Sequence, residues 1–279
     1  MSYGPSPWQQ TQWDWRAAGN FMCGGAGAGL VIFTAWAGIG RPSLSMLVGL
    51  ALIGLGLLCV WLEIGRPLRA LHVFFNPRTS WMTREAFAAA LLFPVGLVAA
   101  SGQVGFWPVA ALAAVLALVF VYCQGRILRG AKGIPAWREA LIVPLLVATA
   151  LAEGGGLWML LHPLQAQAQP WLLGGVAMAL ILRAWLWTLY RRRVKLAPRA
   201  RDVLDKAGNW WLAGSFVPLA ALLWVVSGSI HGTPAALLLA LAGALALAAG
   251  AWFKFVLITR AGFNQGFALT HLPVRGVPR

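Results

Sequence analysis

Eight long apolar segments, separated by charged, proline-rich or glycine-rich breaks, constrain this chain more than any other feature. They lie near residues 17–40, 43–64, 84–101, 105–124, 139–161, 170–190, 209–230 and 234–258. One helical crossing of a bilayer needs about 20 consecutive apolar residues. The segments therefore predict an all-α integral membrane protein whose eight transmembrane helices are arranged as bundles.

Composition supports a membrane subunit and excludes an ordinary water-soluble enzyme. The 279 residues are 60% hydrophobic and 10% charged, whereas soluble domains contain about 45–50% apolar and about 25% charged residues. The apolar segments use most of the length, so any large catalytic domain must belong to another polypeptide. We therefore expect a non-autonomous subunit of a larger complex.

The basic residues predict the orientation of the chain in the membrane. The 22 Lys and Arg outnumber the 7 Asp and Glu, and they gather in the second, fourth and sixth connections between the apolar segments. With both termini on the side of these connections, 21 of the 22 basic residues fall on one face and only Arg41 falls on the other. The positive-inside rule then places both termini in the cytoplasm of a bacterial cell, and no nucleic acid is needed to explain the charge.

The cysteines and histidines predict neither a metal cluster nor a haem in this chain. Cys23, Cys59 and Cys123 lie far apart and form no C-x-x-C pair, so the thiolate set of an iron–sulfur or zinc site is missing from the sequence. None of the 4 histidines lies deep in an apolar segment, where a membrane haem needs two facing axial ligands.

Polar side chains gather at the ends of the apolar segments that are predicted to face the cytoplasm. These are Asn20, Glu63, Glu85, Tyr122, Gln124 and Glu139. Polar groups are costly in a membrane, so they are the first candidates for function. For Glu85 and Glu139 the alternative is helix capping, because a carboxylate in the first turn complements the helix dipole. In this alternative Thr83 is the N-cap of the helix that contains Glu85.

Glu63 is different because it lies at the C-terminal end of its segment, where the helix dipole disfavours an anion. It needs a basic partner such as Arg66 or Arg69. This unfavourable position favours a functional role for Glu63 over a structural one.

Asn20 and Cys23 are three residues apart and therefore share one face of the first helix. The small residues 24–29 that follow allow another helix to approach closely. The alternatives are that Asn20 forms a hydrogen bond across a helix interface and that Cys23 is a small packing residue. For Tyr122 the alternative is an interfacial aromatic belt.

Together, the amide, phenol, thiol and carboxylates at one edge of the first four segments predict a quinone site. A quinone headgroup is apolar apart from two carbonyl oxygens, so binding requires hydrogen-bond donors. Its redox chemistry requires a protonatable group with access to water, while its tail stays in lipid. The first four segments contain residues for each of these tasks.

Glu153 lies within the fifth segment and has no obvious partner close in sequence. It is either a residue of a proton path or a neutral, protonated acid in a helix contact. An acidic residue of this kind also suits ion-coupled secondary transport, whose sites are expected near the bilayer midplane on broken helices. A purely structural membrane tether is the other alternative to a quinone-reactive subunit.

The segment LEIGRPLRALHVFFNPRTSWMTREAF, residues 62–87, resembles the signature loop of the NrfD/DmsC family, the membrane anchor subunits of molybdopterin oxidoreductases. The family's [HE]-x-G-x-P-x-R pattern matches residues 63–69, and its S-x-x-x-R-E element matches residues 80–85. Its N-x-x-[HC] pattern matches residues 20–23. The resemblance is specific in this loop and diffuse elsewhere.

The resemblance implies a haem-free subunit that binds ubiquinone or menaquinone near the face where a four-cluster iron–sulfur protein docks. That protein relays electrons to or from a molybdenum or tungsten subunit, so the iron–sulfur clusters and the molybdopterin belong to the partners. By position, the family's site residues are Glu63 and Glu85 as catalytic groups and Asn20, Cys23, Arg66, Arg69 and Tyr122 as cofactor-binding groups. Glu63 stands where DmsC-like relatives have a histidine, and Cys23 stands where polysulfide-reductase-like relatives have one.

The resemblance and the charge pattern together predict the organisation of the chain. Its parts are an interfacial segment at 1–16, a quinone-site helix bundle at 17–138 with a docking loop at 65–84, a second helix bundle at 139–258 and a cytoplasmic tail at 259–279. Because the loop lies on the arginine-rich face, we expect cytoplasmic catalytic partners and contacts with membrane lipids. This plan is similar to the membrane subunits of phenylacetyl-CoA:acceptor oxidoreductase and cytoplasmic sulfite dehydrogenase.

Overall fold

The computed structural model describes residues 4, 6–38, 44–64, 67–102, 106–167 and 169–267. Helices make up most of this part of the chain, and no β-strand occurs in it beyond an isolated bridge between Gln9 and Phe263. Within the same residues, eight helices are long and apolar enough to cross a membrane. The predicted all-α membrane fold is therefore confirmed.

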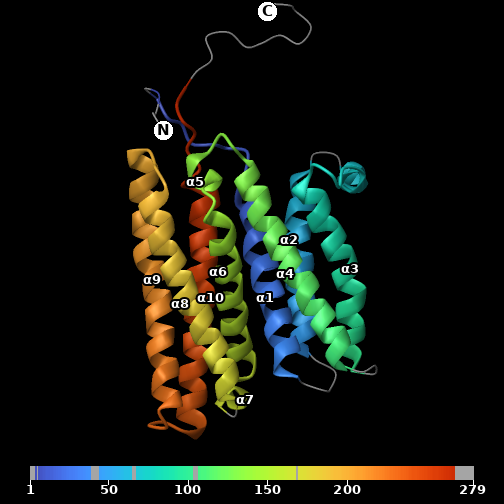
Figure 1. Ribbon diagram of the computed structural model, residues 1–279, viewed down its shortest axis with the longest axis vertical. Helices are drawn as coiled ribbons and strands as arrows, with labels where there is room; N and C mark the ends of the chain where they lie inside the picture. The colour runs from blue at the N-terminus through green and yellow to red at the C-terminus, as the bar shows by residue number, and fades with distance from the viewer. Residues whose placement is uncertain are drawn as a thin grey trace, which may run out of the picture.

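The eight long helices correspond one to one with the predicted apolar segments. They are α1 (Trp15–Ala37), α2 (Leu44–Glu63), α3 (Trp81–Ser101), α4 (Phe106–Gly130), α6 (Ile142–Leu161), α8 (Pro170–Arg193), α9 (Pro198–Val226) and α10 (Gly232–Thr259). Short helices lie in the connections: the 3-10 helix η1 (Pro67–Phe75), α5 (Pro135–Arg138) and α7 (Pro163–Gln167). Figure 1 shows the long helices running roughly side by side.

Some helices extend beyond the predicted segments. α9 begins at Pro198 rather than near residue 209, and α4 continues to Gly130 rather than ending near residue 124. The additional turns carry charged residues, because a helix that leaves the bilayer keeps its backbone hydrogen bonds without needing apolar side chains. Pro198 lies in the first turn of α9, where its missing N–H removes no helical hydrogen bond.

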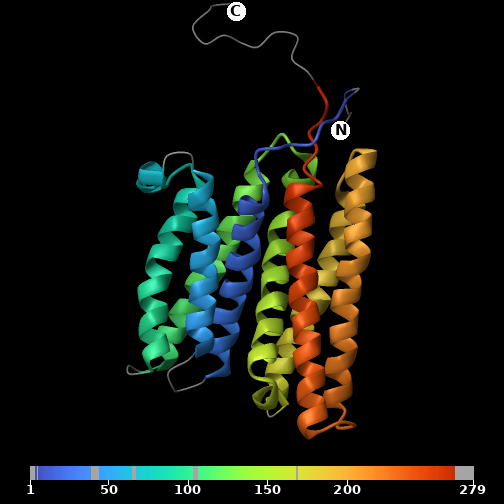
Figure 2. The same ribbon diagram turned by 180° about the vertical axis from the view of Figure 1, so that it is seen from behind.

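Two groups of helices lie beside each other in Figures 1 and 2, α1 to α4 in one group and α6 with α8 to α10 in the other. α1 and α6 lie at the contact between them. In these two helices 78% and 83% of the most apolar stretch is buried, against 33–50% in the other six. α1 and α6 are therefore the centre of the fold, and the other helices present apolar faces to lipid.

Glycines allow α1 and α6 to approach until their backbones touch. A Cβ atom added at Gly29 would lie 2.0 Å from the carbonyl oxygen of Ala150, and one added at Gly154 would lie 2.0 Å from the backbone carbon of Gly29. Any side chain at these positions would force the helices apart. The prediction that residues 24–29 allow close helix packing is confirmed.

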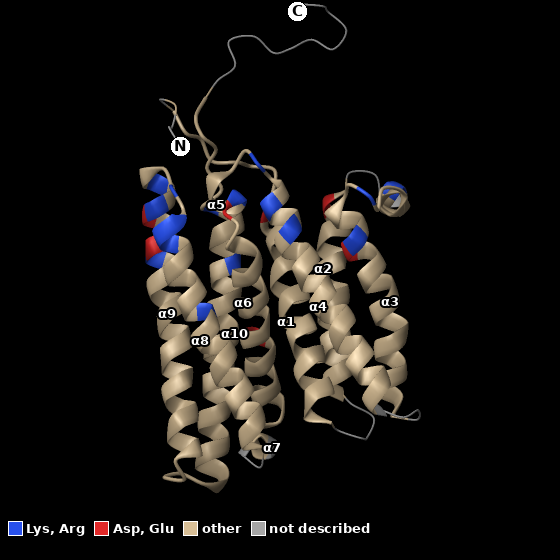
Figure 3. Cartoon of the chain, in the orientation of Figure 1, with Lys and Arg blue, Asp and Glu red and all other residues tan. Residues whose placement is uncertain are grey.

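The N-terminal segment and the segment after α10 lie together at one end of the helices. The Gln10 backbone N–H donates to the carbonyl of Gly262 over 2.8 Å, and that of Asn264 donates to the carbonyl of Trp8 over 3.0 Å. Figure 3 shows that Lys and Arg gather at this same end. We call it the basic end.

Two basic residues depart from the predicted distribution of charge. Arg183 and Lys254 lie within α8 and α10 and are 0% and 2% exposed, so counting them among 21 residues on one face was wrong. The count followed position along the chain, whereas these side chains are held by polar groups inside the protein, which is how charges are accommodated at membrane depth. Arg41 and Arg66 lie outside the described residues.

Candidate functional site

A cavity of about 170 Å³ lies at the basic end between residues of α1, α2, α3 and α4. Its wall is formed by Trp13, Ala17, Asn20, Phe21, Val60, Glu63, Ile64, Met82, Glu85 and Ile127. Three of the predicted site residues, Asn20, Glu63 and Glu85, therefore share one cavity. The other lining side chains are apolar, so the cavity combines an apolar wall with an amide and two carboxyl groups.

Asp14 and Arg16 fix the start of α1 beside this cavity. The Asp14 carboxylate accepts a hydrogen bond from the Arg16 backbone N–H over 2.8 Å and pairs with the Arg16 guanidinium at 2.8 Å. The hydrogen bond from the Arg16 side chain holds the pKa of Asp14 below its ordinary value, so this N-cap stays ionised. Arg16 also donates to the carbonyl of Leu62 over 2.9 Å, which ties α1 to the end of α2.

Glu63 is the last residue of α2 and lies half-buried in the cavity wall. The basic neighbour that acts on its carboxylate is Arg16 of α1. Arg69 is exposed on η1, and none of the three ion pairs among the described residues includes Glu63. Arg16 is itself paired with Asp14, whose negative charge also acts on Glu63, so the predicted cation partner of Glu63 is not found among the described residues. Arg66 falls outside them.

Glu85 is 5% exposed and is held by polar groups of α1 and α4. The Asn20 side-chain amide donates to the Glu85 carboxyl group over 3.3 Å. The Gln124 side-chain amide donates to the backbone carbonyl of Asn20 over 3.0 Å and also forms a side-chain hydrogen bond with Glu85. A carboxyl group, two amides and a backbone carbonyl therefore form one buried network across three helices.

The helix-capping alternative is wrong for both Glu85 and Glu139. Neither α3 nor α6 has an acidic residue in its first turn, and Glu139 instead follows the last residue of α5. The N-cap of α3 is Ser80 rather than Thr83: the Ser80 hydroxyl accepts from the Thr83 backbone N–H over 3.3 Å. The Thr83 hydroxyl donates to the carbonyl of Val73, which fastens η1 to α3.

Asn20 keeps a hydrogen-bond acceptor that the protein does not use. Its side-chain oxygen is buried and has no donor among the described residues. A Cβ atom added at Gly56 of α2 would lie 3.1 Å from this oxygen, so the oxygen lies against the backbone of α2, where only a glycine fits without displacing it. A buried acceptor without a partner is rare in proteins and indicates an unfilled polar interaction at this site.

Cys23, Arg69 and Tyr122 do not line the cavity. Tyr122 is 39% exposed, and its hydroxyl accepts a hydrogen bond from Arg126 over 2.8 Å. The centres of the Tyr122 and Trp81 rings are 5.8 Å apart, with the two rings nearly perpendicular. This arrangement is typical of an interfacial aromatic belt. Cys23 is half-buried in α1 away from the cavity wall.

Comparison with known protein families gives one match. A family model for the DMSO reductase anchor subunit (DmsC) matches residues 40–190, more than half of the 279 residues. The chain belongs to the DmsC family. A comparison with curated proteins found no match.

Membership of the DmsC family makes the chain a multi-pass membrane anchor subunit of a molybdoenzyme complex. The family also implies partner subunits that carry iron–sulfur clusters and molybdenum. The matched residues include α2, η1 and α3, which supply Glu63 and Glu85, whereas α1 with Asn20 precedes them. Among the described residues of this DmsC protein, no group of three or more His, Cys, Asp or Glu is placed to hold a metal ion.

The DmsC-family chain also contains a buried ion pair within the second helix group, and its lysine reaches α1 of the first group. The Lys254 ammonium of α10 donates to Glu153 of α6 over 2.5 Å and to the backbone carbonyl of Phe21 of α1 over 2.9 Å. Glu153 and Lys254 are 0% and 2% exposed. The open question about Glu153 is partly answered, because its partner is a lysine 101 residues away in sequence.

Arg183 lies near this pair and is satisfied by the backbone and by Ser215. Its guanidinium donates to the Ser215 hydroxyl over 3.0 Å and to the carbonyls of Gly214 and Ala246 over 2.6 and 3.1 Å. It also interacts electrostatically with Glu153. Two cations and one anion are thus enclosed within the helices of this DmsC protein.

Sequence reasoning missed Lys254 and Arg183 as members of a polar network, and it named Gln124 among the polar side chains at the helix ends without assigning it a role. Glycines in the neighbouring helix turns are the sequence signal that could have indicated the burial of Lys254. A Cβ atom at Gly25 would lie 2.2 Å from the Lys254 nitrogen, and one at Gly250 would lie 2.4 Å from a Glu153 oxygen. The glycines therefore make room for the ion pair.

Proposed function

We propose that this DmsC-family subunit binds a quinone in the cavity between α1, α2, α3 and α4 and passes electrons between that quinone and a docked iron–sulfur subunit. The observation that carries the proposal is the buried contact between Glu85 and Asn20 in a cavity that also contains Glu63. Protonatable groups in an apolar cavity beside the membrane surface suit a lipid-soluble redox carrier.

The residues present fit a quinone headgroup. The cavity of about 170 Å³ is smaller than the clefts of about 300–1,000 Å³ that enclose whole drug-sized ligands. It therefore suits a ring whose tail remains outside. Phe21, Ile64 and Met82 provide apolar walls, and Met82 is 44% exposed, so the cavity reaches the outer surface of the helices.

Each polar residue has a distinct task in this proposal. A bound quinone would supply the two-electron, two-proton redox chemistry. The Asn20 side chain orients the headgroup: its amide N–H donates to a carbonyl oxygen of the quinone, and its unused oxygen accepts from a hydroxyl of the quinol. Its contact also holds the Glu85 carboxyl group at the cavity wall. Buried Glu85 holds or releases a proton, and half-buried Glu63 connects the cavity with water.

We assign the remaining predicted residues by their positions. The loop at 65–84, which includes Arg66 and Arg69, is proposed to dock the iron–sulfur subunit, in line with its place beside the cavity. Cys23 and Tyr122 do not line the cavity and receive no role in binding the headgroup. Helices within 17–138 then form the quinone-reactive part, and those within 139–258 support it.

The basic end is proposed to face the cytoplasm of a bacterial cell. Lys and Arg gather there (Figure 3), and positive charge is retained on the cytoplasmic side of membrane proteins. In this orientation an iron–sulfur subunit with four clusters and a molybdopterin subunit are cytoplasmic. Of the predicted cytoplasmic tail at 259–279, the described residues as far as Phe267 belong to this end. The quinone is proposed to be ubiquinone or menaquinone.

The buried ion pair suggests ion-coupled transport as an alternative function. Glu153, Arg183 and Lys254 lie on α6, α8 and α10, which are continuous α-helices. Transporters of this type bind their substrates where helices are interrupted. The continuous helices therefore favour the quinone proposal.

Asn20→Ala and Glu63→Gln test this function against a purely structural tether. Each substitution is expected to lower quinone-dependent turnover of the assembled complex by about tenfold, since a hydrogen bond that involves a charged group contributes about 1.5–3 kcal/mol. Turnover is measured in membranes, with a reduced dye as electron donor to the iron–sulfur subunit and a short-tailed quinone as acceptor. If both variants stay within a factor of about two of the unmodified complex, the chain is a tether.

A further inference from the structure

A groove of about 850 Å³ lies between α9 and α10, on the side of the fold away from the Glu85 cavity. It is lined by Val203, Lys206, Ala207, Asn209 and Trp210 on one side and by Leu245, Ala248, Ala249, Trp252, Val256 and Arg260 on the other. None of these residues takes part in the proposed quinone chemistry. The groove therefore requires an explanation of its own.

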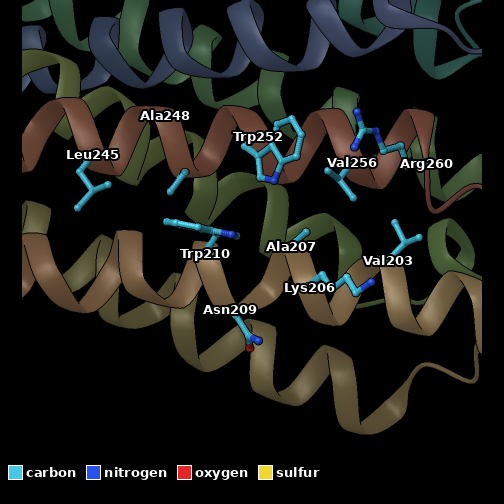
Figure 4. A pocket seen from close by; sticks show the side chains of 11 residues that line it. Val203, Lys206, Ala207, Asn209, Trp210, Leu245, Ala248, Trp252, Val256 and Arg260 are labelled. Carbon is cyan, nitrogen blue, oxygen red and sulfur yellow. The ribbon is translucent and has the colours of Figure 1, made fainter.

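The groove is cationic at one end and apolar at the other. Figure 4 shows Lys206 and Arg260 toward one end, with Leu245 at the opposite end and the indoles of Trp210 and Trp252 between them. The cationic end belongs to the basic end of the molecule, because Arg260 follows the last residue of α10. The groove thus changes from charged to apolar along its length, as a membrane lipid does from its headgroup to its acyl chains.

The two cations are available to a ligand. Lys206 and Arg260 are exposed, and neither takes part in the three ion pairs found among the described residues. The Arg260 guanidinium lies 5.1 Å from the centre of the Trp252 ring, which holds it over the groove. No carboxylate lines the groove, and nearby Asp205 is bound by Arg191.

The tryptophans supply the intermediate polarity that a lipid requires. Trp210 is 72% exposed and Trp252 is 41% exposed, so both rings present large surfaces to the groove or the bilayer. Indoles favour the level of the lipid glycerol and ester groups, because one edge carries an N–H donor and the rest is apolar.

We propose that the groove is a binding site for one anionic phospholipid. Its phosphate lies between Lys206 and Arg260, its ester region lies against the two indoles, and an acyl chain follows Ala248 toward Leu245. Basic pockets between helices on the cytoplasmic side of a membrane bind anionic headgroups in this way. The absence of a carboxylate among the lining residues disfavours a zwitterionic lipid, whose cationic group would meet two positive charges.

A quinone fits this groove less well than a phospholipid. Its polar groups are a lysine, an arginine and the exposed Asn209, and the groove has no carboxyl or other acidic group for proton exchange with a quinone. The lipid proposal is thus independent of the quinone proposal, and either can fail while the other stands.

Native mass spectrometry of the purified full-length subunit tests the proposal. The protein is incubated in detergent with equal amounts of dioleoyl-phosphatidylglycerol and dioleoyl-phosphatidylcholine, and the lipids that stay bound are counted. We expect one phosphatidylglycerol to be retained. The double variant Lys206→Gln/Arg260→Gln is expected to lower the preference for it about twentyfold, since each basic residue near an anionic lipid contributes a factor of about five.

Two further variants make the result specific. Arg199→Gln/Arg201→Gln removes the same charge from exposed residues of α9 that do not line the groove, and it is expected to keep the preference. Ala248→Trp keeps both cations but fills the groove from an exposed position, and it is expected to abolish retention.

Four results would overturn the proposal. The first is an unchanged phosphatidylglycerol preference in the Lys206/Arg260 double variant, and the second is an equal loss in the Arg199/Arg201 control, which would indicate general surface charge. The third is undiminished lipid retention by folded Ala248→Trp protein. A quinone retained in this groove in place of phospholipid would count against it as well.

Discussion

Replacing Glu85 by glutamine is expected to lower quinone-dependent turnover of the assembled complex by about a hundredfold or more, because a positioned acid or base contributes about 10²–10⁴ to such a rate. Glutamine has nearly the same shape, and its side-chain oxygen still accepts from Asn20. It takes up and releases no proton, so the chemistry is lost while the fold is kept. The measurement is quinone reduction by membranes that contain the complex, with a reduced viologen dye as donor.

Glu139→Gln is the matched control for this substitution. Glu139 is a partly buried carboxylate at the same basic end, but it lines a different hollow beside Arg138 and Lys195. Its variant is expected to keep the turnover of the unmodified complex. Reduction of the iron–sulfur clusters by the dye is expected to be normal in both variants, which shows that the complex has assembled. A Glu85→Gln complex with more than about a third of normal quinone turnover would contradict the assigned role of Glu85.

Replacing Lys254 by methionine is expected to lower the free energy of unfolding by about 3–5 kcal/mol, because it leaves a buried carboxylate without its partner. Glu153 is 0% exposed, and one of its two carboxyl oxygens already has no donor among the described residues. The loss of Lys254 would also remove the contact with the carbonyl of Phe21, which joins α10 to α1. The measurement is denaturant unfolding of the purified subunit in detergent micelles.

The double variant Glu153→Gln/Lys254→Met separates the cost of an isolated charge from a general loss of packing. It is expected to recover most of the lost stability, because it removes both charges of the pair together, and Arg183 keeps its hydrogen bonds to Ser215 and to two backbone carbonyls. Lys132→Met, at an exposed lysine in the connection before α5, is expected to change stability by less than about 0.5 kcal/mol. A Lys254→Met protein as stable as this control would show that the buried pair does not stabilise the fold.

The eight crossings could be predicted from the sequence because each one requires a long apolar run, and charge, proline or glycine separates the runs. The ends of α4 and α9 could not be predicted, since a helix continues into water without an apolar pattern. The length of an apolar run is set by contact with lipid, whereas the end of a helix is set by backbone hydrogen bonding. The apolar pattern therefore predicts the crossings but not the helix ends.

Part of the candidate site was also predictable. Asn20, Glu63 and Glu85 are polar residues at the ends of apolar helices, and this unusual position identified them. Cys23 and Tyr122 were identified by the same reasoning, but neither lines the cavity, and Tyr122 is exposed. In a membrane protein the lipid-facing side of a helix is as apolar as the inner side, so the sequence of one helix does not indicate which face is inward.

The partner of Glu153 and the burial of Lys254 and Arg183 escaped prediction for a different reason. Glu153 and Lys254 are 101 residues apart in sequence, and they meet only because α6 and α10 pack together. The rule that places positive charge on the cytoplasmic side counts residues near helix ends and does not register a lysine or arginine that is neutralised inside the fold. Arg183 was assigned to the wrong environment for the same reason.

Photolabelling of the assembled complex with a short-tailed quinone analogue that carries a photoreactive group tests the central claim most directly. The account predicts label in peptides that contain residues 13–21 and 82–85, which line the Glu85 cavity, and it predicts that excess quinone removes this label. Label that excess quinone removes only from peptides of α9 and α10, or from none of the peptides that line the cavity, would contradict it.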